Sequence, residues 1–216
     1  MIRVLIVDDH TIVRSAFKRL IEEDKSMTVI GELSSGEEVV QTAKELEPDV
    51  IIMDINMPGI GGLEATRRLS LSYPKAKILV VSAHTEGLFP KRLLDFGIAG
   101  YLSKQSDPKH LCEAIHTVHE GKNYFDEALM GDIAAAKIGA GETDLFDALS
   151  DRELQIILMV ARGINVNEIA KKLFLAEKTI NGHRRKAFEK LGVETDVDAT
   201  KLLIKRGLIE PDSQWH

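Results

Sequence analysis

Runs of apolar residues alternate with amphipathic stretches along the first 122 residues of the chain. Within the apolar runs, residues do not alternate with polar ones, which is typical of strands covered on both faces of a parallel sheet. The stretches between them have the spacing of amphipathic helices. Strands are predicted at 3–7, 28–33, 50–53, 78–81 and 99–103, and helices near 12–23, 35–46, 62–72, 87–96 and 107–120. This order predicts an α/β, doubly wound domain with a five-stranded parallel sheet in the flavodoxin-like order 2-1-3-4-5.

The pattern changes after residue 122. Residues 123–148 are acidic and dotted with glycine, and they predict a linker with a short helix. Residues 149–216 contain only helical signals, with helices expected up to about 161 and at 166–173, 177–190 and 196–206. The chain is therefore expected to hold an α/β domain over 1–122, a linker over 123–148 and a small all-α domain over 149–216.

Several helix ends carry local capping signals. Ser35 with Glu38, and Ser150 with Glu153, have the spacing of a capping box. Asp107 followed by Pro108 is typical of an N-cap and the first helical residue, and Gly163 is expected to end a helix.

Composition indicates a cytoplasmic protein. No stretch approaches the roughly 20 apolar residues that span a membrane, and the N-terminal apolar run is short and ends in two acids, unlike a signal peptide. The single cysteine, Cys112, has no internal partner for a disulfide, which fits a reducing compartment.

Polar side chains stand where the predicted strands end. Asp8 and Asp9 follow the first strand, Asp54 the third and Ser82 the fourth, and Lys104 lies just past the fifth. The carboxyl ends of parallel strands meet at one edge of a sheet, where ligands bind. Crowded carboxylates favour a hard cation such as Mg²⁺, and a carboxylate next to a metal ion and an ammonium is a candidate nucleophile for phosphoryl transfer.

Each of these residues alone has an ordinary structural interpretation, as a cap, a turn residue or a surface lysine. Their occurrence together at successive strand ends favours a functional site. His10 and His84 lie near the same edge, but a hard-cation site prefers oxygen ligands, so both are interpreted as loop residues. Pro58 and the glycines at 59, 61 and 62 are expected to keep the loop after Asp54 turned and free of side chains.

The segments VLIVDDH, MDINMPGIGG, VVSAH and GYLSK resemble the receiver domain of two-component response regulators over residues 1–122. That resemblance implies that Asp54 is the phosphoacceptor. It implies that Asp8 and Asp9, with the backbone carbonyl of Asn56, bind Mg²⁺ beside Asp54. Ser82 and Lys104 would then contact the phosphoryl group, and the rotamer of Tyr101 would follow Ser82.

A basic segment lies in the C-terminal part of an otherwise acidic chain, whose net charge is −6. Residues 171–190 contain seven bases and two acids. A short helix at 166–173, a tight turn and a longer helix from about 177 have helix-turn-helix spacing, which is typical of DNA-binding domains. A solvated face of an ordinary helix pair is the alternative interpretation.

The stretch LSDRELQIILMVARGINVNEIAKKLFLAEKTINGHRRKAFEKLGV resembles the DNA-binding domain of the LuxR/NarL/FixJ class, and the whole chain resembles the GacA/UvrY/LetA group of that class. By this resemblance Asn181, Gly182 and Arg185 would face base edges, with Lys178, Thr179, His183 and Arg184 nearer the phosphates. Ala176 stands where a serine N-cap is usual in the class, Gly182 where a larger residue is usual, and Asp196 where many members have arginine.

The resemblance implies a phosphorylation-activated transcription regulator that is not an enzyme. The implied partners are a sensor histidine kinase or a phosphotransfer domain, double-stranded promoter DNA, RNA polymerase and a second copy of the chain after phosphorylation. Two alternatives are a phosphorylation-independent regulator or dimerisation module, and an aspartyl-nucleophile phosphatase. The phosphatase would usually carry an acid/base residue two positions after its nucleophile, where this chain has Asn56.

Overall fold

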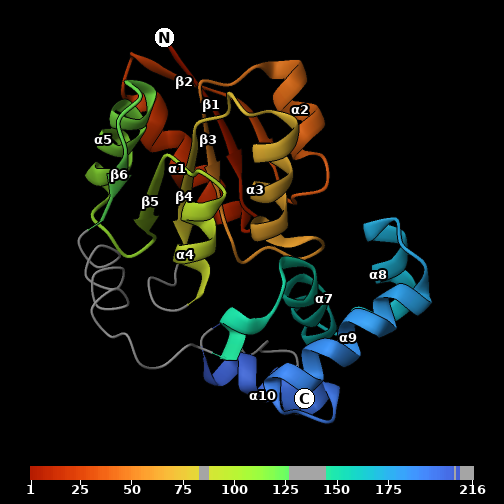
Figure 1. Ribbon diagram of the computed structural model, residues 1–216. Coiled ribbons are helices and arrows are strands. Elements are labelled where there is room, and N and C mark those ends of the chain that lie inside the picture. The colour runs from red at the N-terminus through yellow and green to blue at the C-terminus, as the bar shows by residue number, and fades with distance from the viewer. Residues whose placement is uncertain (83–87, 127–144, 207, 210–216) are drawn as a thin grey trace. The chain divides into compact units, whose positions relative to one another are not determined.

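The computed structural model describes residues 1–82, 88–126, 145–206 and 208–209, which belong to two compact units, each described by itself below (Figure 1). Part of the predicted linker and the predicted loop residue His84 lie outside the described residues. Within the described part of the chain, no helix is both long and apolar enough to cross a membrane.

A parallel sheet forms the centre of the N-terminal unit, in the order β2-β1-β3-β4-β5-β6. The strands are β1 (Ile2–Val7), β2 (Met27–Leu33), β3 (Val50–Met53), β4 (Ile78–Ser82), β5 (Gly100–Ser103) and β6 (Tyr124–Phe125). The predicted order of the first five strands is confirmed. The prediction of five strands is wrong, because β6 pairs in parallel with β5, placing Phe125 opposite Tyr101. Two residues are too few to show a hydrophobic period, so the sequence assigned them to the linker.

Helices cover both faces of the sheet (Figure 1). The helices α1 (Thr11–Glu23) and α5 (Pro108–His119) lie together on one face of the sheet. The remaining helices of this unit, each of which follows the strand of the same number along the chain, are α2 (Val39–Leu46), α3 (Gly61–Ser72) and α4 (Leu88–Asp95). Val4, Ile6 and Ile52 on the sheet pack in one core cluster with Ile21 of α1 and Ile115 of α5. Their neighbours Leu5 and Ile51 are equally buried, which explains why the strand sequences do not alternate.

Two capping predictions in this unit have different outcomes. Asp107 is the N-cap of α5, and its side chain accepts a hydrogen bond from the amide of Lys109. The capping box at Ser35 and Glu38 is wrong, because α2 begins only at Val39 and its N-cap makes no side-chain bond. The segment before α2 instead packs on the loop before α3, where the Glu37 carboxylate accepts a bond from the amide of Ile60.

The C-terminal unit is helical in its described residues. A 3₁₀ turn, η1 (Leu145–Ala148), precedes α7 (Asp151–Ala161), α8 (Val166–Leu173), α9 (Glu177–Leu191) and α10 (Asp196–Lys205). The helix α9 packs on α7 and α8, and α10 packs on α7. Leu154, Ile169, Ile180 and Leu203 are buried between these helices.

The sequence signals for the ends of α7 are confirmed. Ser150 and Glu153 form a complete capping box, and Gly163, just past the helix, has a φ of 76°. Glu153 also forms an ion pair with Lys190, whose Nζ lies 2.7 Å from Oε2 of Glu153, and this pair connects α7 to α9. The helix α9 begins after Ala176, which makes no side-chain cap, as the departure at this position predicts.

Candidate phosphoryl-transfer and DNA-binding sites

The predicted site residues of the N-terminal unit meet at the carboxyl edge of the sheet. Hydrogen bonds of the sheet type continue one residue past the ends of β3 and β5, and they fix the backbone positions of the residues that carry the site's side chains. The amide of Asp54 donates to the carbonyl of Val7 at 2.8 Å, and the amide of Lys104 donates to the carbonyl of Ser82 at 2.8 Å. The strands β1, β3 and β5, of which β3 and β5 are separated by β4, therefore deliver Asp8, Asp54 and Lys104 to one edge of the sheet.

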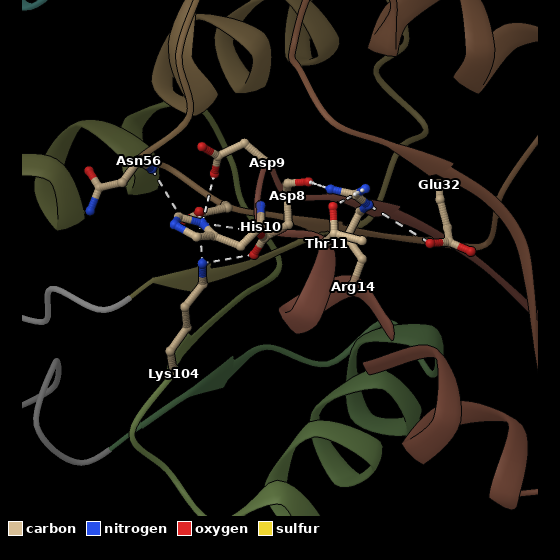
Figure 2. A network of polar contacts seen from close by, with 9 residues as sticks. Asp8, Asp9, His10, Thr11, Arg14, Glu32, Asn56 and Lys104 are labelled. Atoms are coloured by element: carbon tan, nitrogen blue, oxygen red, sulfur yellow. Dashed lines mark hydrogen bonds and ion pairs between the residues drawn. The ribbon is translucent and has the colours of Figure 1, made fainter. Parts of the chain in front are cut away.

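The ammonium of Lys104 joins the two buried carboxylates. Its Nζ lies 2.7 Å from Oδ2 of Asp8 and 2.8 Å from Oδ2 of Asp54, whose side chains are each 1% exposed. The remaining oxygens accept backbone bonds, with Oδ1 of Asp8 held by the amide of His10 and Oδ1 of Asp54 by the amide of Asn56. Figure 2 shows Lys104 reaching this cluster from the side opposite Asp9 and Asn56.

Burial and charge act in opposite directions on this group. Burial raises the pKa of Asp54 above its usual value, although the ammonium of Lys104 opposes that shift. Burial lowers the pKa of Lys104, but attraction to Asp54 and Asp8 outweighs burial, and the pKa of Lys104 is raised. The site therefore keeps Lys104 charged beside the carboxylate of Asp54.

The same residues offer ligands to a cation. Oxygens of Asp8, Asp9 and Asp54, with a ring nitrogen of His10, all lie within 4.8 Å of one another. Asp9 is the more accessible carboxylate, with a side chain that is 26% exposed. Three carboxylates from two adjacent strands match the oxygen ligands and low protein coordination number that Mg²⁺ takes, so the donor set fits this ion.

His10 lies closer to the carboxylates than its interpretation as an ordinary loop residue suggests. Its Nδ1 is 2.9 Å from Oδ1 of Asp9 and 3.5 Å from Oδ1 of Asp8. Its side chain is 60% exposed, so the imidazole lies at the rim of the cluster rather than inside it.

The glycine loop after Asp54 is required for two different reasons. Gly59 and Gly61 each have a φ of 75°, which favours glycine. Gly62 has no such φ, but a Cβ there would overlap the carbonyl oxygen of Asp54 and lie 2.6 Å from Cα of Ile55. The start of α3 therefore touches the backbone of the residue that carries the reactive carboxylate, and only glycine allows that contact.

Ser82 and Tyr101 lie on adjacent strands beside this edge. Ser82 ends β4 opposite Ser103, and Tyr101 lies opposite Val80. Both side chains are buried, and Tyr101 is 1% exposed.

Two residues of this region were not predicted from the sequence. Arg14 on α1 donates to the carbonyl oxygen of Asp8 at 2.7 Å (Figure 2). The one feature of the sequence that could have indicated this contact is an arginine one turn into the helix that follows two acids. Asp126 accepts a bond from the amide of Ser103 at 2.8 Å, and its own amide donates to the carbonyl of Tyr101. Its position depends on β6, which the sequence pattern does not reveal.

The predicted DNA-contact residues all lie on α9, and the structure divides them into two groups. Lys178, Thr179, Asn181 and Arg185 are exposed, and Gly182 lies between them with open space where a Cβ would be. The spacing of 178, 181, 182 and 185 places these four on one stripe of the helix. This stripe is opposite Ile180, Ala187 and Leu191, which are buried against the other helices.

His183 and Arg184 flank the buried side of α9 instead. Nδ1 of His183 is buried. Arg184 forms two hydrogen bonds with Asp196 at the start of α10, from Nε to Oδ1 at 2.7 Å and from Nη2 to Oδ2 at 2.6 Å. The side chain of Arg184 is 30% exposed.

Both halves of the chain match known families. Residues 4–116 match the response regulator receiver domain, and residues 147–203 match the bacterial regulatory proteins of the luxR family. The chain is 42% identical over 214 residues to the response regulator UvrY of Escherichia coli (strain K12), covering 99% of this chain and 98% of that protein. It is 40% identical to the response regulator GacA of Pseudomonas aeruginosa, covering 99% of this chain and all of that protein.

Solved structures of RcsB from Salmonella enterica serovar Typhimurium are also similar. One, bound to promoter rprA in the presence of the phosphomimetic BeF₃⁻, has a TM-score of 0.71 and 27% identity and covers 94% of this chain and 98% of that chain. The fold and the two sites thus define a phosphorylation-activated, DNA-binding transcription regulator. The chain belongs to the response regulators with a LuxR-type DNA-binding domain, and it is similar to UvrY and GacA.

Proposed function

We propose that Asp54 accepts a phosphoryl group from a sensor histidine kinase or a phosphotransfer domain. The observation that supports this most directly is the position of Lys104, whose ammonium contacts both Asp8 and Asp54 within 2.8 Å in a buried cluster. A cation held beside a carboxylate is placed to stabilise charge on a phosphoryl group that arrives there.

In the proposed reaction an oxygen of the Asp54 carboxylate attacks the phosphorus atom of a phosphohistidine. The new O–P bond forms as the P–N bond breaks, and the departing imidazole nitrogen keeps the electron pair. Lys104 neutralises charge on the phosphoryl oxygens, and the amide of Asn56, which donates to Oδ1 of Asp54 at 3.1 Å, orients the carboxylate.

We infer that Asp8, Asp9, Asp54 and the backbone carbonyl of Asn56 hold Mg²⁺. When bound, the ion supplies positive charge that lets the carboxylates and a phosphoryl group share one site. The support for this assignment is the set of three carboxylates, whose ligand atoms lie within 4.8 Å of one another.

The protein is proposed to keep the phosphoryl group on Asp54 rather than to hydrolyse small phosphorylated substrates. A phosphatase that forms an aspartyl phosphate needs a group to move a proton to its leaving group. Asn56, two residues after Asp54, has an amide that does not titrate in water. The chain is therefore proposed not to be an enzyme with a substrate of its own.

The phosphorylated site is proposed to act on the C-terminal domain through Ser82 and Tyr101. Ser82 would move toward the phosphoryl group and Tyr101 would change rotamer with it, shifting the receiver between two states. The regulator would then bind a promoter as a homodimer in the cytoplasm, with the exposed stripe of α9 in the major groove, and act on RNA polymerase.

In this interface Arg185 and Asn181 are proposed to read base edges, as arginine reads guanine and asparagine reads adenine. Gly182 lets the helix backbone approach the bases. Lys178 and Thr179, at the start of the helix, are proposed to contact DNA phosphates, and His183 is proposed to contact the DNA backbone at the edge of the helix. The domain boundaries proposed are 1–122, 123–148 and 149–216, except that β6 belongs to the sheet of the first domain and η1 to the C-terminal unit.

The experiment compares wild type with Asp54→Ala in the presence of Mg²⁺ and acetyl phosphate. Intact mass and binding to a promoter library are followed in the same samples. Wild type should gain one phosphoryl group and bind DNA more tightly and selectively, and the variant should do neither. Equal, selective DNA binding by both proteins would favour a phosphorylation-independent regulator instead.

A further inference from the structure

The pair between Arg184 and Asp196 differs in kind from other contacts of basic residues on α9. Both oxygens of Asp196 accept bonds from Arg184, at 2.6 and 2.7 Å, in the fork geometry that makes arginine–carboxylate pairs strong. The guanidinium also lies over the ring of Phe188, with Cζ 5.1 Å from the ring centroid. Arg184 is thus held by two residues of its own domain, Asp196 and Phe188.

The adjacent arginine has the opposite environment. Arg185 is 76% exposed, and its pair with Glu189 at 3.7 Å is a single contact one turn along the same helix. Such a surface pair contributes little and exchanges easily with a phosphate. One residue of separation on a helix is a rotation of about 100°, which takes Arg184 off the exposed stripe of Lys178, Asn181 and Arg185.

The start of α10 also favours the position of the Asp196 carboxylate. Asp196 is the first residue of α10, where the partial positive charge of a helix N-terminus favours a carboxylate. If Arg184 moved to a DNA phosphate, it would give up two bonds to one anion for bonds to another. It would also leave Asp196 uncompensated beside a polyanion, so the exchange gains nothing.

We propose that Asp196 keeps Arg184 from contacting DNA. Arg184 instead joins α9 to α10, and the residue at position 196 decides whether Arg184 adds a contact with a DNA phosphate. This inference rests on the proposed binding of DNA by α9. It reverses the sequence-based prediction that Arg184 lies near the phosphates. In this chain, the carboxylate of Asp196 therefore removes the positive charge of Arg184 from the interface.

The test measures the affinity of the full-length protein for a duplex DNA of arbitrary sequence as a function of salt. Each phosphate contact contributes about 0.9 to the slope of log affinity against log salt concentration. Arg184→Gln should leave the slope unchanged while lowering the thermal midpoint. On DNA of arbitrary sequence Arg185 has no matched base to read and should contact a phosphate instead, so Arg185→Gln should reduce the slope by about 0.9.

Asp196→Asn keeps a hydrogen-bond acceptor for folding but frees the charge of Arg184. The slope should rise by about 0.9, so that the variant's advantage over wild type shrinks about 3.5-fold between 50 and 200 mM salt. The double variant Arg184→Gln/Asp196→Asn should lose this gain. Glu194→Gln, which removes an exposed negative charge nearby, is the matched control for net charge and should have the wild-type slope.

Two results would overturn this inference and leave the proposed function intact. One is a slope that Arg184→Gln reduces as much as Arg185→Gln does, and the other is an equal rise of the slope in Glu194→Gln and Asp196→Asn. A different result separates the failure of the proposed function. If neither Lys178→Gln nor Arg185→Gln changes the slope, α9 is not the DNA-binding face, and both proposals fail.

Discussion

Nζ of Lys104 lies 2.8 Å from Oδ2 of Asp54, although 50 residues separate them in the chain. The same ammonium lies 2.7 Å from Asp8. Without a metal ion, this lysine is the cation that balances two buried carboxylates. Since Mg²⁺ would bind the same oxygens, the ion and Lys104 are expected to compete for them.

Replacing Lys104 with methionine should therefore have two linked effects. Removing one member of a buried ion group leaves uncompensated charge, so the free energy of unfolding without Mg²⁺ should fall by about 3 kcal/mol. Added Mg²⁺ should raise the thermal midpoint of Lys104→Met more than that of wild type, which calorimetry measures in both conditions.

Lys122→Met is the control, because Lys122 is 71% exposed in its pair with Glu120. Its stability should stay within about 0.5 kcal/mol of wild type, with a wild-type response to Mg²⁺. An equal Mg²⁺ response in all three proteins would show that Lys104 and the ion do not compete.

Gly62→Ala should damage both stability and phosphorylation. The added Cβ would overlap the carbonyl oxygen of Asp54, so the loop must move and carry the carboxylate with it. A loss of at least about 2 kcal/mol in the free energy of unfolding is expected, together with a slower reaction with acetyl phosphate. Urea unfolding and intact-mass time courses measure the two effects.

Gly97→Ala is the matched comparison, because Gly97 has a φ of 75° but open space around its Cβ position. It should cost about 1 kcal/mol and leave the rate of phosphorylation unchanged. Wild-type kinetics in Gly62→Ala would contradict the close contact between α3 and Asp54.

The contact between Asp24 and His116 should make stability depend on acid. His116 donates to Asp24 at 2.9 Å, and this bond, followed by bonds from Ser26, lowers the pKa of Asp24 to about 2. A carboxylate with a lowered pKa stabilises the fold above its unfolded pKa of 3.8, and that contribution is lost as the pH falls toward 2.

Asp24→Asn should therefore be less stable than wild type at pH 5, and the difference should shrink as the pH falls from 4 toward 2. Urea midpoints over this range measure it. Ser26→Ala removes only the bond from the hydroxyl to Asp24 and keeps the bond from the backbone amide, so it should show a smaller change over the same range. A difference between wild type and Asp24→Asn that does not vary with pH would rule out this linkage.

Gly182→Ala should separate folding from DNA binding. Gly182 lies inside α9 with open space at its Cβ position, so alanine should stabilise the helix by about 1 kcal/mol. If the backbone approaches DNA here, affinity for promoter DNA should fall although the protein is more stable. Thermal unfolding and an equilibrium binding assay give the two quantities.

Gly163→Ala is the opposite control in the same domain. Gly163 lies outside any helix and has a φ of 76°. Alanine there should lower the free energy of unfolding by about 1 kcal/mol without changing the affinity for DNA. Unchanged affinity in Gly182→Ala would mean that glycine there has no role in contacting DNA.

The sequence alone determined the order of the sheet and the residues at its carboxyl edge. The strand runs, the acids that follow them and the capping box at Ser150 and Glu153 are all local patterns, in which each residue's role depends on neighbours a few positions away. Parallel strands share one direction, so residues at their ends must gather at one edge. The exposed stripe of α9 follows from helical period in the same way.

Only the tertiary structure decided which side chains pair across the chain. The strand β6 exists because β5 offers an edge to two residues without a pattern of their own. The start of α2 was shifted past Ser35 by packing on the loop before α3. The sequence predicted Lys104 at the same edge as Asp8 and Asp54, but not that its ammonium contacts both carboxylates. Nor did hydrophobic period or motif spacing indicate that Arg184 pairs with Asp196, because these contacts join separate elements.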